Sequence, residues 1–364
     1  MMTRRKLLSA AAGGLCLPMA NSRANVGSAK AAGYRMPLES MPHARTFMQW
    51  PAVADIYGSN KKLNAVREKI ALIANSIARF EPVVLLGRPE QLDGAAPMLN
   101  GNIELWPIET QDLWCRDSGP TFVKNAEGDL AVSELGFNGW GNKQEHEDDA
   151  RIAAKVAEKL GLKLFNNGIV GEGGGVEFDG EGTLLAHASS WVNPNRNSGS
   201  QVDVERLLLD ALGAEKMIWA PGVSGADITD YHIDALARYI KPGQVLIQLP
   251  DKPDPSDPWS EAAYETYNIL KSSTDAQGRK LEIVVIPDPK NIRSRQRDFV
   301  SCYANYFVCN GAVIGAEFGD DVADEKARAT LQELYPGREI VSLNVDPIGE
   351  AGGGIHCSTQ QQPA

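Results

Sequence analysis

The sequence has few cysteines, and it lacks an apolar run long enough to cross a bilayer. Its five cysteines are spread over 364 residues, and their spacing matches no zinc-binding pattern. The small, apolar run at residues 10–19 falls short of the roughly 20 residues that a membrane-spanning helix needs. We therefore expect no metal centre and no membrane span. The composition, 43% hydrophobic and 23% charged, is that of a soluble globular protein.

The N-terminus has the layout of a cleaved export signal. Arg4, Arg5 and Lys6 precede the apolar run, and Ser22-Arg23-Ala24 supplies a cleavage point. The adjacent arginines resemble the twin-Arg type of signal, which carries folded proteins. A basic, disordered tail is the alternative. We expect a periplasmic or secreted protein with three parts: an export signal at 1–24, a linker at 25–35 and a single domain at 36–364.

Charge and cysteine content limit the partners and covalent links of the mature chain. Removal of residues 1–24 takes away four basic residues and no acidic one, so the formal charge goes from −11 to −15. Such a surface repels nucleic acid and attracts small cations, although solubility alone also explains it. Cys115, Cys302, Cys309 and Cys357 remain after cleavage. Four cysteines permit two disulfides in an exported chain, but a chain of this length buries a core without them, and we expect free thiols.

One helix-then-strand unit recurs five times along the mature chain. Each unit has apolar residues at helical spacing, followed by a short run rich in Val, Ile or Leu. Glycine ends two of the helices, and Pro258 begins another. The expected helices lie within 63–77, 152–160, 204–212, 259–270 and 323–334, and the expected strands lie at 83–86, 162–165, 217–219, 281–286 and 339–343.

After each of these strands comes a turn and then an unusual polar residue. These residues are Asp117, Glu172, His232 with Asp234, Asn305 and Cys357. Repeated units that each deliver one polar group to a common centre are typical of a closed ring. A doubly wound sheet is the alternative for alternating helices and strands. That fold calls for a Gly-rich phosphate loop after the first strand, and Gly87-Arg88-Pro89 is not one.

Two triple-glycine runs flank the most reactive of these residues. Glu172 comes directly before Gly173–Gly175, and Cys357 follows Gly352–Gly354 after two residues. Triple glycine lets the backbone approach a neighbour closely, at an entropic cost that a surface tail has no reason to carry. Three carboxylates in one pocket call for a cation between them. A planar guanidinium suits paired carboxylates, and with a thiol and a histidine the implied chemistry is attack on the guanidinium carbon.

Each of these residues also has a plainer interpretation. Asp117 could form a surface pair with Arg116, and Glu172 could be a solvated turn residue. His232 and Asp234, two residues apart, could belong to a polar helix start. Cys357 could be a buried small hydrophobe, the commonest fate of a free cysteine. The plain interpretations are less probable together than one at a time.

The segment from Met36 to the C-terminus resembles the agmatine deiminase branch of the guanidino-modifying superfamily, which includes bacterial peptidylarginine deiminase. Seven motifs in the same order carry the resemblance, and it implies a five-bladed α/β propeller with its site on the pseudo-fivefold axis. The motifs are Met41-Pro42-His43 with Trp50-Pro51, Trp114 to Pro120, Glu172-Gly173-Gly174, Asp179 to Thr183, Asn193 to Asn197, His232-Ile233-Asp234 with Leu236-Ala237-Arg238, and Gly353 to Pro363.

The resemblance also implies roles for the residues of the site, without metal or organic cofactor. Cys357 looks like the nucleophile and His232 like the general acid and base. Asp117 and Asp234 look like the guanidinium clamp, with Glu172 as a further acidic group of the catalytic and binding set. Trp114 is a candidate to stack on the guanidinium, with core packing as its alternative.

The match departs from the family pattern near the general acid. Agmatine deiminases usually carry Gly where Tyr231 precedes His232, Asn at Ala235 and His at Glu177, and often Met at Cys115. Tyr231 is the largest change because it adds bulk beside His232. These departures leave the far half of the substrate open. A free carboxylate there would want an arginine, and Arg196 and Arg238 are candidates.

The resulting hypothesis is an exported guanidino hydrolase that converts agmatine and water into N-carbamoylputrescine and ammonia, as in putrescine biosynthesis. A peptidylarginine or arginine deiminase with the same catalytic set is the first alternative. A polyamine-binding protein on an inactive scaffold is the alternative from another class, and the thiol argues against it. The sequence leaves open whether the chain forms a homodimer.

Overall fold

The computed structural model describes residues 27–364. The export signal expected at residues 1–24 therefore lies outside the described residues. Within the expected linker, Ala29 and Tyr34 are buried in a small apolar cluster with Val123, Ala131 and Phe165. The division of the chain into signal, linker and domain stays a prediction.

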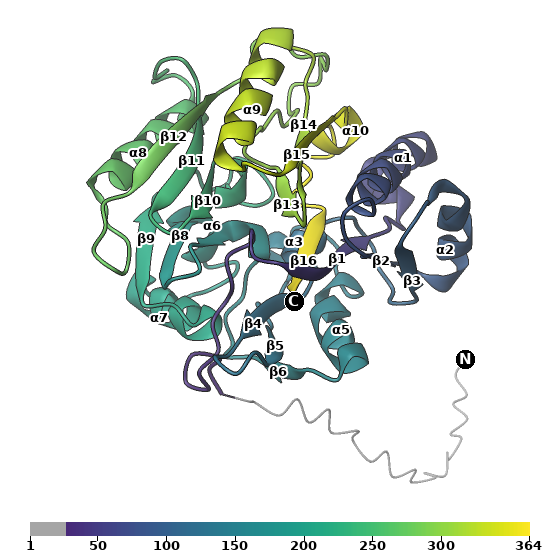
Figure 1. Cartoon of the computed structure of the whole chain (residues 1–364), viewed down its shortest axis with the longest axis horizontal. Coiled ribbons are helices and arrows are strands. Elements are labelled where there is room, and N and C mark those ends of the chain that lie inside the picture. Colours follow the sequence, from purple (N-terminus) through teal and green to yellow (C-terminus); the bar gives the residue numbers. More distant parts are fainter. Residues whose placement is uncertain (1–26) are drawn as a thin grey trace, which may run out of the picture.

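The fold is of the mixed α/β class, as expected, and contains five small sheets in the described part of the chain. Figure 1 shows the sheets set around a common centre, with the longer helices on the outside. The first sheet has four strands in the order β16-β1-β2-β3: Thr359–Pro363, His43–Gln49, Val83–Leu86 and Ile103–Trp106. The others are β4-β5-β6 (Thr121–Lys124, Leu130–Ser133, Lys163–Phe165), β7-β8-β9 (Val176–Phe178, Thr183–His187, Lys216–Ala220), β10-β11-β12 (Ala237–Lys241, Gln244–Leu249, Glu282–Pro287) and β13-β14-β15 (Phe307–Cys309, Ala312–Ala316, Glu339–Leu343).

Every sheet combines an antiparallel pair with a parallel strand that is reached through a helix. The five helices expected from apolar spacing are confirmed: α1 (Asn60–Ile77), α5 (Ile152–Leu160), α7 (Gln201–Leu212), α8 (Pro258–Ser272) and α9 (Asp321–Leu334). Ser59 caps the first turn of α1, and Ser200 forms a reciprocal capping box with Asp203 in α7. Gly161 and Gly213 end α5 and α7 in the left-handed conformation that glycine adopts without strain.

The shorter helices lie in the connections between these elements. They are α2 (Pro89–Ala95), α3 (Cys115–Ser118), α4 (Gly139–Asn142), α6 (Ala188–Trp191) and α10 (Asp346–Gly349), with single 3₁₀ turns η1 (Ala54–Tyr57), η2 (Ala96–Met98), η3 (Asp149–Arg151), η4 (Gly173–Gly175) and η5 (Ile233–Ala235).

The last strand of the chain completes the first sheet. β16 pairs antiparallel with β1, so that Met48 lies opposite Thr359 and Phe47 opposite Gln360. Figure 1 shows the C-terminus close to the centre of the molecule. The two ends of the domain are thereby joined, and Cys357 is held just before a paired strand.

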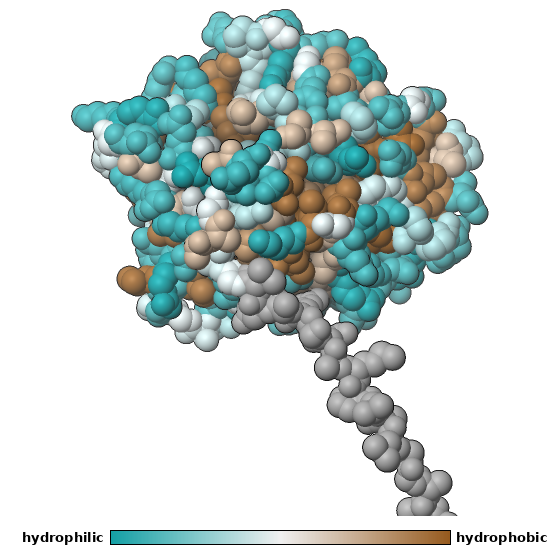
Figure 2. Space-filling view, turned by 60° about the horizontal axis from the view of Figure 1, so that its bottom comes forward, coloured by the Kyte–Doolittle hydropathy of each residue, from teal (hydrophilic) through white to brown (hydrophobic). Residues whose placement is uncertain are grey.

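The apolar cores lie beneath the helices and between neighbouring sheets, and the first of them combines α1 with residues of β1, β2, β13 and β14. In the first unit, Leu63, Val66, Ile70 and Ile77 of α1 are almost fully buried against β1 and β2, and each such side chain contributes about 1.5–3 kcal/mol. On the face drawn in Figure 2, hydrophilic residues surround separate apolar patches. Across residues 27–364 no helix has the length and apolar character needed to cross a bilayer. Four thiols there are unpaired: Cys115, Cys302, Cys309 and Cys357.

Candidate active site

The polar side chains predicted for the site lie at equivalent places, each just before the edge strand that pairs antiparallel with its neighbour in a sheet. Figure 1 shows β4, β10, β13 and β16 near the centre of the molecule, so the residues that precede them converge there. Asp117 in α3 precedes β4, Glu172 precedes η4 and β7, His232 and Asp234 precede β10, Asn305 precedes β13, and Cys357 precedes β16.

The second triple-glycine run carries the backbone through a narrow gap to Cys357. A Cβ atom on Gly353 would come within 2.4 Å of the Trp114 ring, and one on Gly354 within 2.4 Å of Asn305 Oδ1. Real side chains do not show such contacts, so both positions need glycine. Beyond the gap, Asn305 Oδ1 accepts from Cys357 N at 3.2 Å, and Asn305 Nδ2 donates to Cys357 Sγ at 3.1 Å. Asn305 thus fixes both the backbone and the sulfur of Cys357.

A large cavity of about 900 Å³ opens over this sulfur. Cys357, His232, Asp117, Asp234 and Trp114 all line it, as do Asn305 and Trp140. Eight carboxylate residues line the cavity, against Lys62 and Arg297 as its basic residues other than His232. The structure therefore brings most of the predicted site together on an acidic surface that suits a cationic ligand.

Two carboxylates and a glycine define the innermost part of the cavity. Asp117 Oδ2 accepts from Trp140 Nε1 at 2.9 Å, and Asp117 Oδ1 accepts from Gly174 N at 3.2 Å. A Cβ atom on Gly174 would lie 2.8 Å from Asp117 and 3.1 Å from Asp234, so the first glycine run keeps the space between them free. The buried Oδ1 atom of Asp234 has no hydrogen-bond partner within residues 27–364. An acceptor of this kind fits a guanidinium N–H group.

His232 lies between two carboxylates at the edge of this space. Its Nε2 atom is 3.1 Å from Glu172 Oε2, and its Nδ1 atom is 3.6 Å from Asp117 Oδ1. Glu172 in turn accepts from Arg196 Nε at 2.8 Å and 3.0 Å, and Arg196 Nη1 donates to Asp230 at 2.8 Å. The imidazole is therefore oriented by a buried Glu–Arg–Asp chain behind it.

Burial and mutual proximity shift the pKa values of these groups. Burial alone would lower the pKa of His232, but Asp117, Glu172 and Asp234 outweigh it and raise that pKa to about 9. Burial, with Asp234 and Glu172 nearby, raises the pKa of Asp117 to about 6. Burial, Asp234 and Asp117 raise the pKa of the Cys357 thiol well above its usual value. At neutral pH the site thus holds a protonated histidine and a neutral thiol.

Comparison with known proteins identifies the family. Residues 35–363 match the model of the Porphyromonas-type peptidyl-arginine deiminases. The chain belongs to this family. It is 36% identical over 361 residues to an agmatine deiminase of Pseudomonas aeruginosa, with 92% of this chain and 97% of the relative covered. It is 34% identical over 362 residues to an agmatine deiminase of Ectopseudomonas mendocina, with 92% and 97% covered.

A solved structure places the fold in the same group. The agmatine deiminase of Enterococcus faecalis superposes with a TM-score of 0.84 at 28% identity, covering 93% of this chain and 98% of the other. The chain is accordingly a hydrolase that acts on the C–N bonds of guanidino groups. The resemblance noted from the motifs is confirmed.

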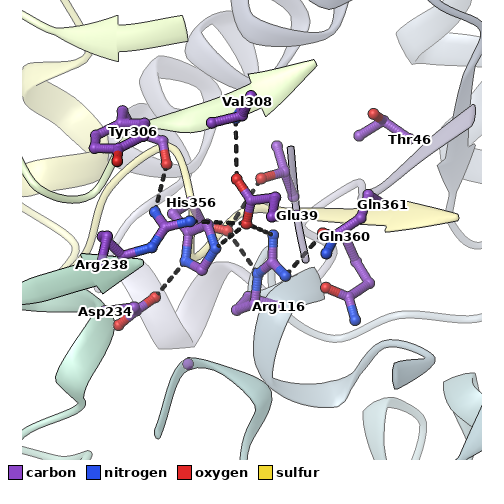
Figure 3. Close-up of polar contacts among 12 residues, drawn as sticks. Glu39, Thr46, Arg116, Asp234, Arg238, Tyr306, Val308, His356, Gln360 and Gln361 are labelled. Atoms are coloured by element: carbon purple, nitrogen blue, oxygen red, sulfur yellow. Dashed lines mark hydrogen bonds and ion pairs between the residues drawn. The ribbon is translucent and has the colours of Figure 1, made fainter. Parts of the chain in front are cut away.

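Behind the cavity, this deiminase family member has a second histidine assembly that the sequence did not reveal. Figure 3 shows Glu39 at its centre, between Arg116, Arg238 and His356. His356 Nδ1 is 2.7 Å from Asp234 Oδ2, and its Nε2 atom is 2.7 Å from Glu39 Oε2. Burial raises the pKa of Asp234, but His356, His232 and Arg238 outweigh it, so the net shift is downward. The assembly keeps Asp234 ionised and its orphan oxygen turned from His356.

The structure corrects the expectation for two arginines. We considered Arg196 and Arg238 for the far end of the pocket, but neither lines the cavity. Both are buried in ion pairs, Arg196 with Glu172 and Asp230, Arg238 with Glu39 at 2.8 Å and with Glu177 at 2.7 Å. The acidic surplus at the reacting centre is also smaller than the sequence suggested, because Arg196 already neutralises Glu172.

The remaining predicted residues divide between cavity and core. Glu172 is 1% exposed and does not line the cavity, so its position favours orientation of His232 over direct contact with a ligand. Trp114 lines the cavity beside Gly353 and also packs in the first core, where Trp50 is buried without reaching the cavity. Trp140 also lines the cavity and donates a hydrogen bond directly to Asp117.

Proposed function

We propose that this protein hydrolyses agmatine to N-carbamoylputrescine and ammonia through a covalent adduct on Cys357. One observation carries the proposal: Cys357, His232, Asp117 and Asp234 line a single acidic cavity. The relatives named agmatine deiminase, which match over nearly the whole chain, support the choice of substrate.

The arrangement suits nucleophilic attack on a guanidinium carbon. Asp117 and Asp234 would clamp the N–H groups of the cation. The bound positive charge offsets the carboxylates, so the thiol of Cys357 loses its proton to solvent when substrate binds. Sulfur then adds to the carbon, and protonated His232 donates a proton to the departing nitrogen. Ammonia leaves, and a positively charged S-alkylthiouronium adduct remains on Cys357.

Water then hydrolyses the adduct, and in this half of the reaction His232 accepts a proton instead of donating one. Neutral His232 takes a proton from the attacking water as its oxygen bonds to the carbon. The C–S bond then breaks, and the proton of the new hydroxyl passes to sulfur, which releases the ureido product and restores the thiol. The proton given up at binding ends on ammonia, so charge and atoms balance.

Product analysis of the purified protein tests the proposal. Incubation with agmatine should release ammonia and N-carbamoylputrescine in equal amounts, and acid quenching should trap the adduct on the Cys357 peptide for mass spectrometry. Cys357→Ser should bind agmatine without turnover. Binding without turnover by the unaltered protein would instead identify a polyamine-binding protein.

Substrate-assisted activation has its own test. Alkylation of Cys357 by iodoacetamide should shift to lower pH when a non-reactive guanidino compound is bound. An identical pH profile with and without the compound would show that the thiol is activated by other means.

Arginine and arginyl peptides are the second candidate substrates. The matching family is described as peptidyl-arginine deiminases, and exposed Arg297 and Lys62 at the cavity could meet a carboxylate. A panel of agmatine, free arginine and a peptide ending in arginine separates the two proposals. Gel filtration with light scattering would show whether the protein forms the homodimer that the sequence left open.

We propose, finally, that residues 1–24 direct export by the twin-Arg route. The support is the sequence alone, with Arg4 and Arg5 before a short apolar run. Cell fractionation should place the processed protein outside the cytoplasm, and replacement of both arginines by lysine should retain the precursor inside.

A further inference from the structure

Tyr231 holds a backbone conformation that side chains rarely adopt. Its φ is 69°, and that of its neighbour Asp230 is 59°, in the left-handed region that favours glycine. Glycine adopts this region without strain, so the tyrosine is carried here at a conformational cost. Such strain persists only where the surroundings hold it, and it gathers at functional sites.

The surroundings hold Tyr231 from several sides. Its backbone N–H donates to Asp227 Oδ1 at 3.2 Å, and its carbonyl is 2.9 Å from His187 Nδ1. Its ring stacks on His187 with centroids 4.5 Å apart and meets the Trp259 ring edge-on at 4.6 Å. Burial lowers the pKa of His187 to about 4, so its imidazole is neutral at physiological pH. The phenol ring is thus fixed in one place.

The same ring lines one region of the cavity, called the chamber below, together with Trp259, Asp257, Gln248 and Asp288. Tyr231 is only 8% exposed, and it lines the cavity next to His232. Its hydroxyl group has no hydrogen-bond partner among residues 27–364. Unlike the Tyr239 hydroxyl, it is not among the fully enclosed side-chain atoms that lack a partner, so it is open to the cavity. The partner is therefore expected to come from a ligand or from solvent inside the chamber.

The other walls of the chamber supply aromatic surface and negative charge. Trp259 and Asp257 come from the start of α8, Gln248 from β11 and Asp288 from the end of β12, and all line the cavity. Because β11 and β12 are parallel neighbours, Gln248 and Asp288 emerge at the same edge, and Gln248 Nε2 donates to Asp288 Oδ1 at 2.7 Å. No basic residue of the described chain forms an ion pair with Asp288 or Asp257.

Nearby basic groups do not neutralise the chamber. Lys62 and Arg297 line the same cavity but are exposed. Burial, with Asp257 and Asp251 nearby, raises the pKa of Asp288, as expected for a carboxylate that lacks a cation. Carboxylate oxygens, a phenol oxygen and an indole face together are the groups that bind an alkylammonium ion.

We propose that this chamber, walled by Tyr231, Trp259, Asp257 and Asp288, is a second cation subsite that binds the primary ammonium group at the far end of a guanidino substrate. The inference rests on the proposed function, because the guanidinium end is taken to lie between Asp117 and Asp234. Tyr231 then acts as a specificity residue, since it closes the chamber beside the general acid and presents its free hydroxyl to the ammonium. The carboxylate of a substrate such as free arginine would be repelled in the chamber, because Asp257 and Asp288 have no basic partner among the described residues.

A pair of substrates that differ only in the far amine tests the subsite. Agmatine and n-butylguanidine share the guanidinium and the four-carbon chain, and only agmatine carries the second cation. Asp288→Asn should raise KM for agmatine about tenfold with little change in kcat, which corresponds to one charge-assisted hydrogen bond. Tyr231→Phe, which keeps the ring and its packing, should raise the same KM about threefold, in line with a neutral hydrogen bond. Neither change should affect KM for n-butylguanidine.

Glu261→Gln is the matched control for charge. Glu261 lies on α8 near Asp257 but is exposed and does not line the cavity, so its loss should leave KM for both compounds unchanged. Equal effects of Asp288→Asn on agmatine and n-butylguanidine would overturn the subsite, as would an effect of Glu261→Gln equal to that of Asp288→Asn. Preference of the unaltered protein for free arginine over agmatine would also overturn it.

Direct binding separates failure of the subsite from failure of the proposed reaction. In the Cys357→Ser background, calorimetry should show that agmatine binds more tightly than n-butylguanidine, and that Asp288→Asn removes the difference. If the unaltered protein turns over neither compound but this difference is found, the hydrolase proposal fails and the subsite stands. If both compounds are hydrolysed but bind equally, the subsite fails and the hydrolase proposal stands.

Discussion

Two histidine assemblies of similar composition flank Asp117 and Asp234, the proposed guanidinium clamp. On one side the order is Asp117, His232, Glu172, Arg196 and Asp230; on the other it is Asp234, His356, Glu39, Arg238 and Glu177. His232 lines the cavity, so the first set is called the open assembly. His356 does not line it, so the second set is called the closed assembly. The distance from histidine to clamp aspartate is 3.6 Å on the open side and 2.7 Å on the closed side. In the proposed mechanism, the same residue types would serve proton transfer where the imidazole reaches the cavity, and orientation where it is enclosed.

The different contacts of Asp117 and Asp234 also explain why the pKa values of these two carboxylates shift in opposite directions. The close contact with His356 helps to hold the pKa of Asp234 below its usual value despite burial. Asp117 lacks such a tight partner, and burial raises its pKa to about 6. Asp234 is therefore ionised at neutral pH, and Asp117 can change charge near neutral pH.

Removal of each histidine should separate the two roles most strongly. His232→Gln should lower kcat by about a thousandfold, the range expected for a lost general acid, with a modest change in stability. His356→Gln should mainly raise KM and shift the acid limb of the pH profile to higher pH. The reason is that Asp234 loses the contact that keeps it ionised. Ammonia-release kinetics over a pH series check both. Equal loss of kcat in the two variants would contradict the division of roles.

Arg238 provides the next test, because the closed assembly depends on it. Arg238→Met removes the partner of Glu177 and one partner of Glu39, and a buried charge left without its partner costs about 3–5 kcal/mol of unfolding free energy. Arg238→Lys should recover only part of the loss, since one ammonium cannot replace the separate contacts of Nε, Nη1 and Nη2. Urea denaturation gives the values. Unfolding of Arg238→Met at the urea concentration of the unaltered protein would show that the pairs contribute no net stability.

More of the open assembly than of the closed assembly could be predicted from the sequence. The helix α1 was predictable from its apolar periodicity alone, and α5 and α7 were predictable because their periodicity also ends at a glycine. The glycine runs pointed to Glu172 and Cys357, since close backbone approach needs glycine at Gly174 and Gly353. The lining of one cavity by Cys357, His232, Asp117 and Asp234 agrees with the expected convergence, and their roles stay predictions.

The closed assembly could not be predicted from the sequence, for physical reasons. Glu39, Arg238 and His356 are far apart in the sequence, and a charged residue gives no local sign that it will be buried beside its partner. The left-handed conformations of Trp140, at φ 55°, and of Tyr231 were equally hidden, because glycine is the residue expected there. Only tertiary contacts hold these side chains where they are.

The open assembly predicts a pH optimum with two limits. Activity, as kcat/KM, should rise with pH through about 6 as Asp117 ionises and fall through about 9 as His232 loses its proton. The pKa of His232 is higher in the folded protein than the 6.5 of the free side chain, so its contribution to stability is complete below pH 6.5 and disappears as pH rises through about 9. A pH series of initial rates and of urea midpoints measures both. Activity that stays constant from pH 5 to pH 10 would contradict the assignment.

The smallest predicted effect concerns the hydrogen bond between Trp140 and Asp117 in the open assembly. Trp140 Nε1 donates to Asp117 Oδ2 at 2.9 Å, and this bond favours the ionised carboxylate. Trp140→Phe should therefore raise the pKa of Asp117, move the acid limb of kcat/KM to higher pH and raise KM by roughly fivefold, because a hydrogen bond of this kind contributes about 1 kcal/mol. Trp219→Phe is the matched control, since Trp219 donates in the same way to Glu205 at 2.8 Å and neither residue lines the cavity. An equal shift of the acid limb in both variants would show that this limb does not reflect ionisation of Asp117. The looser contacts of Asp117 in the open assembly would then play no part in the pH dependence.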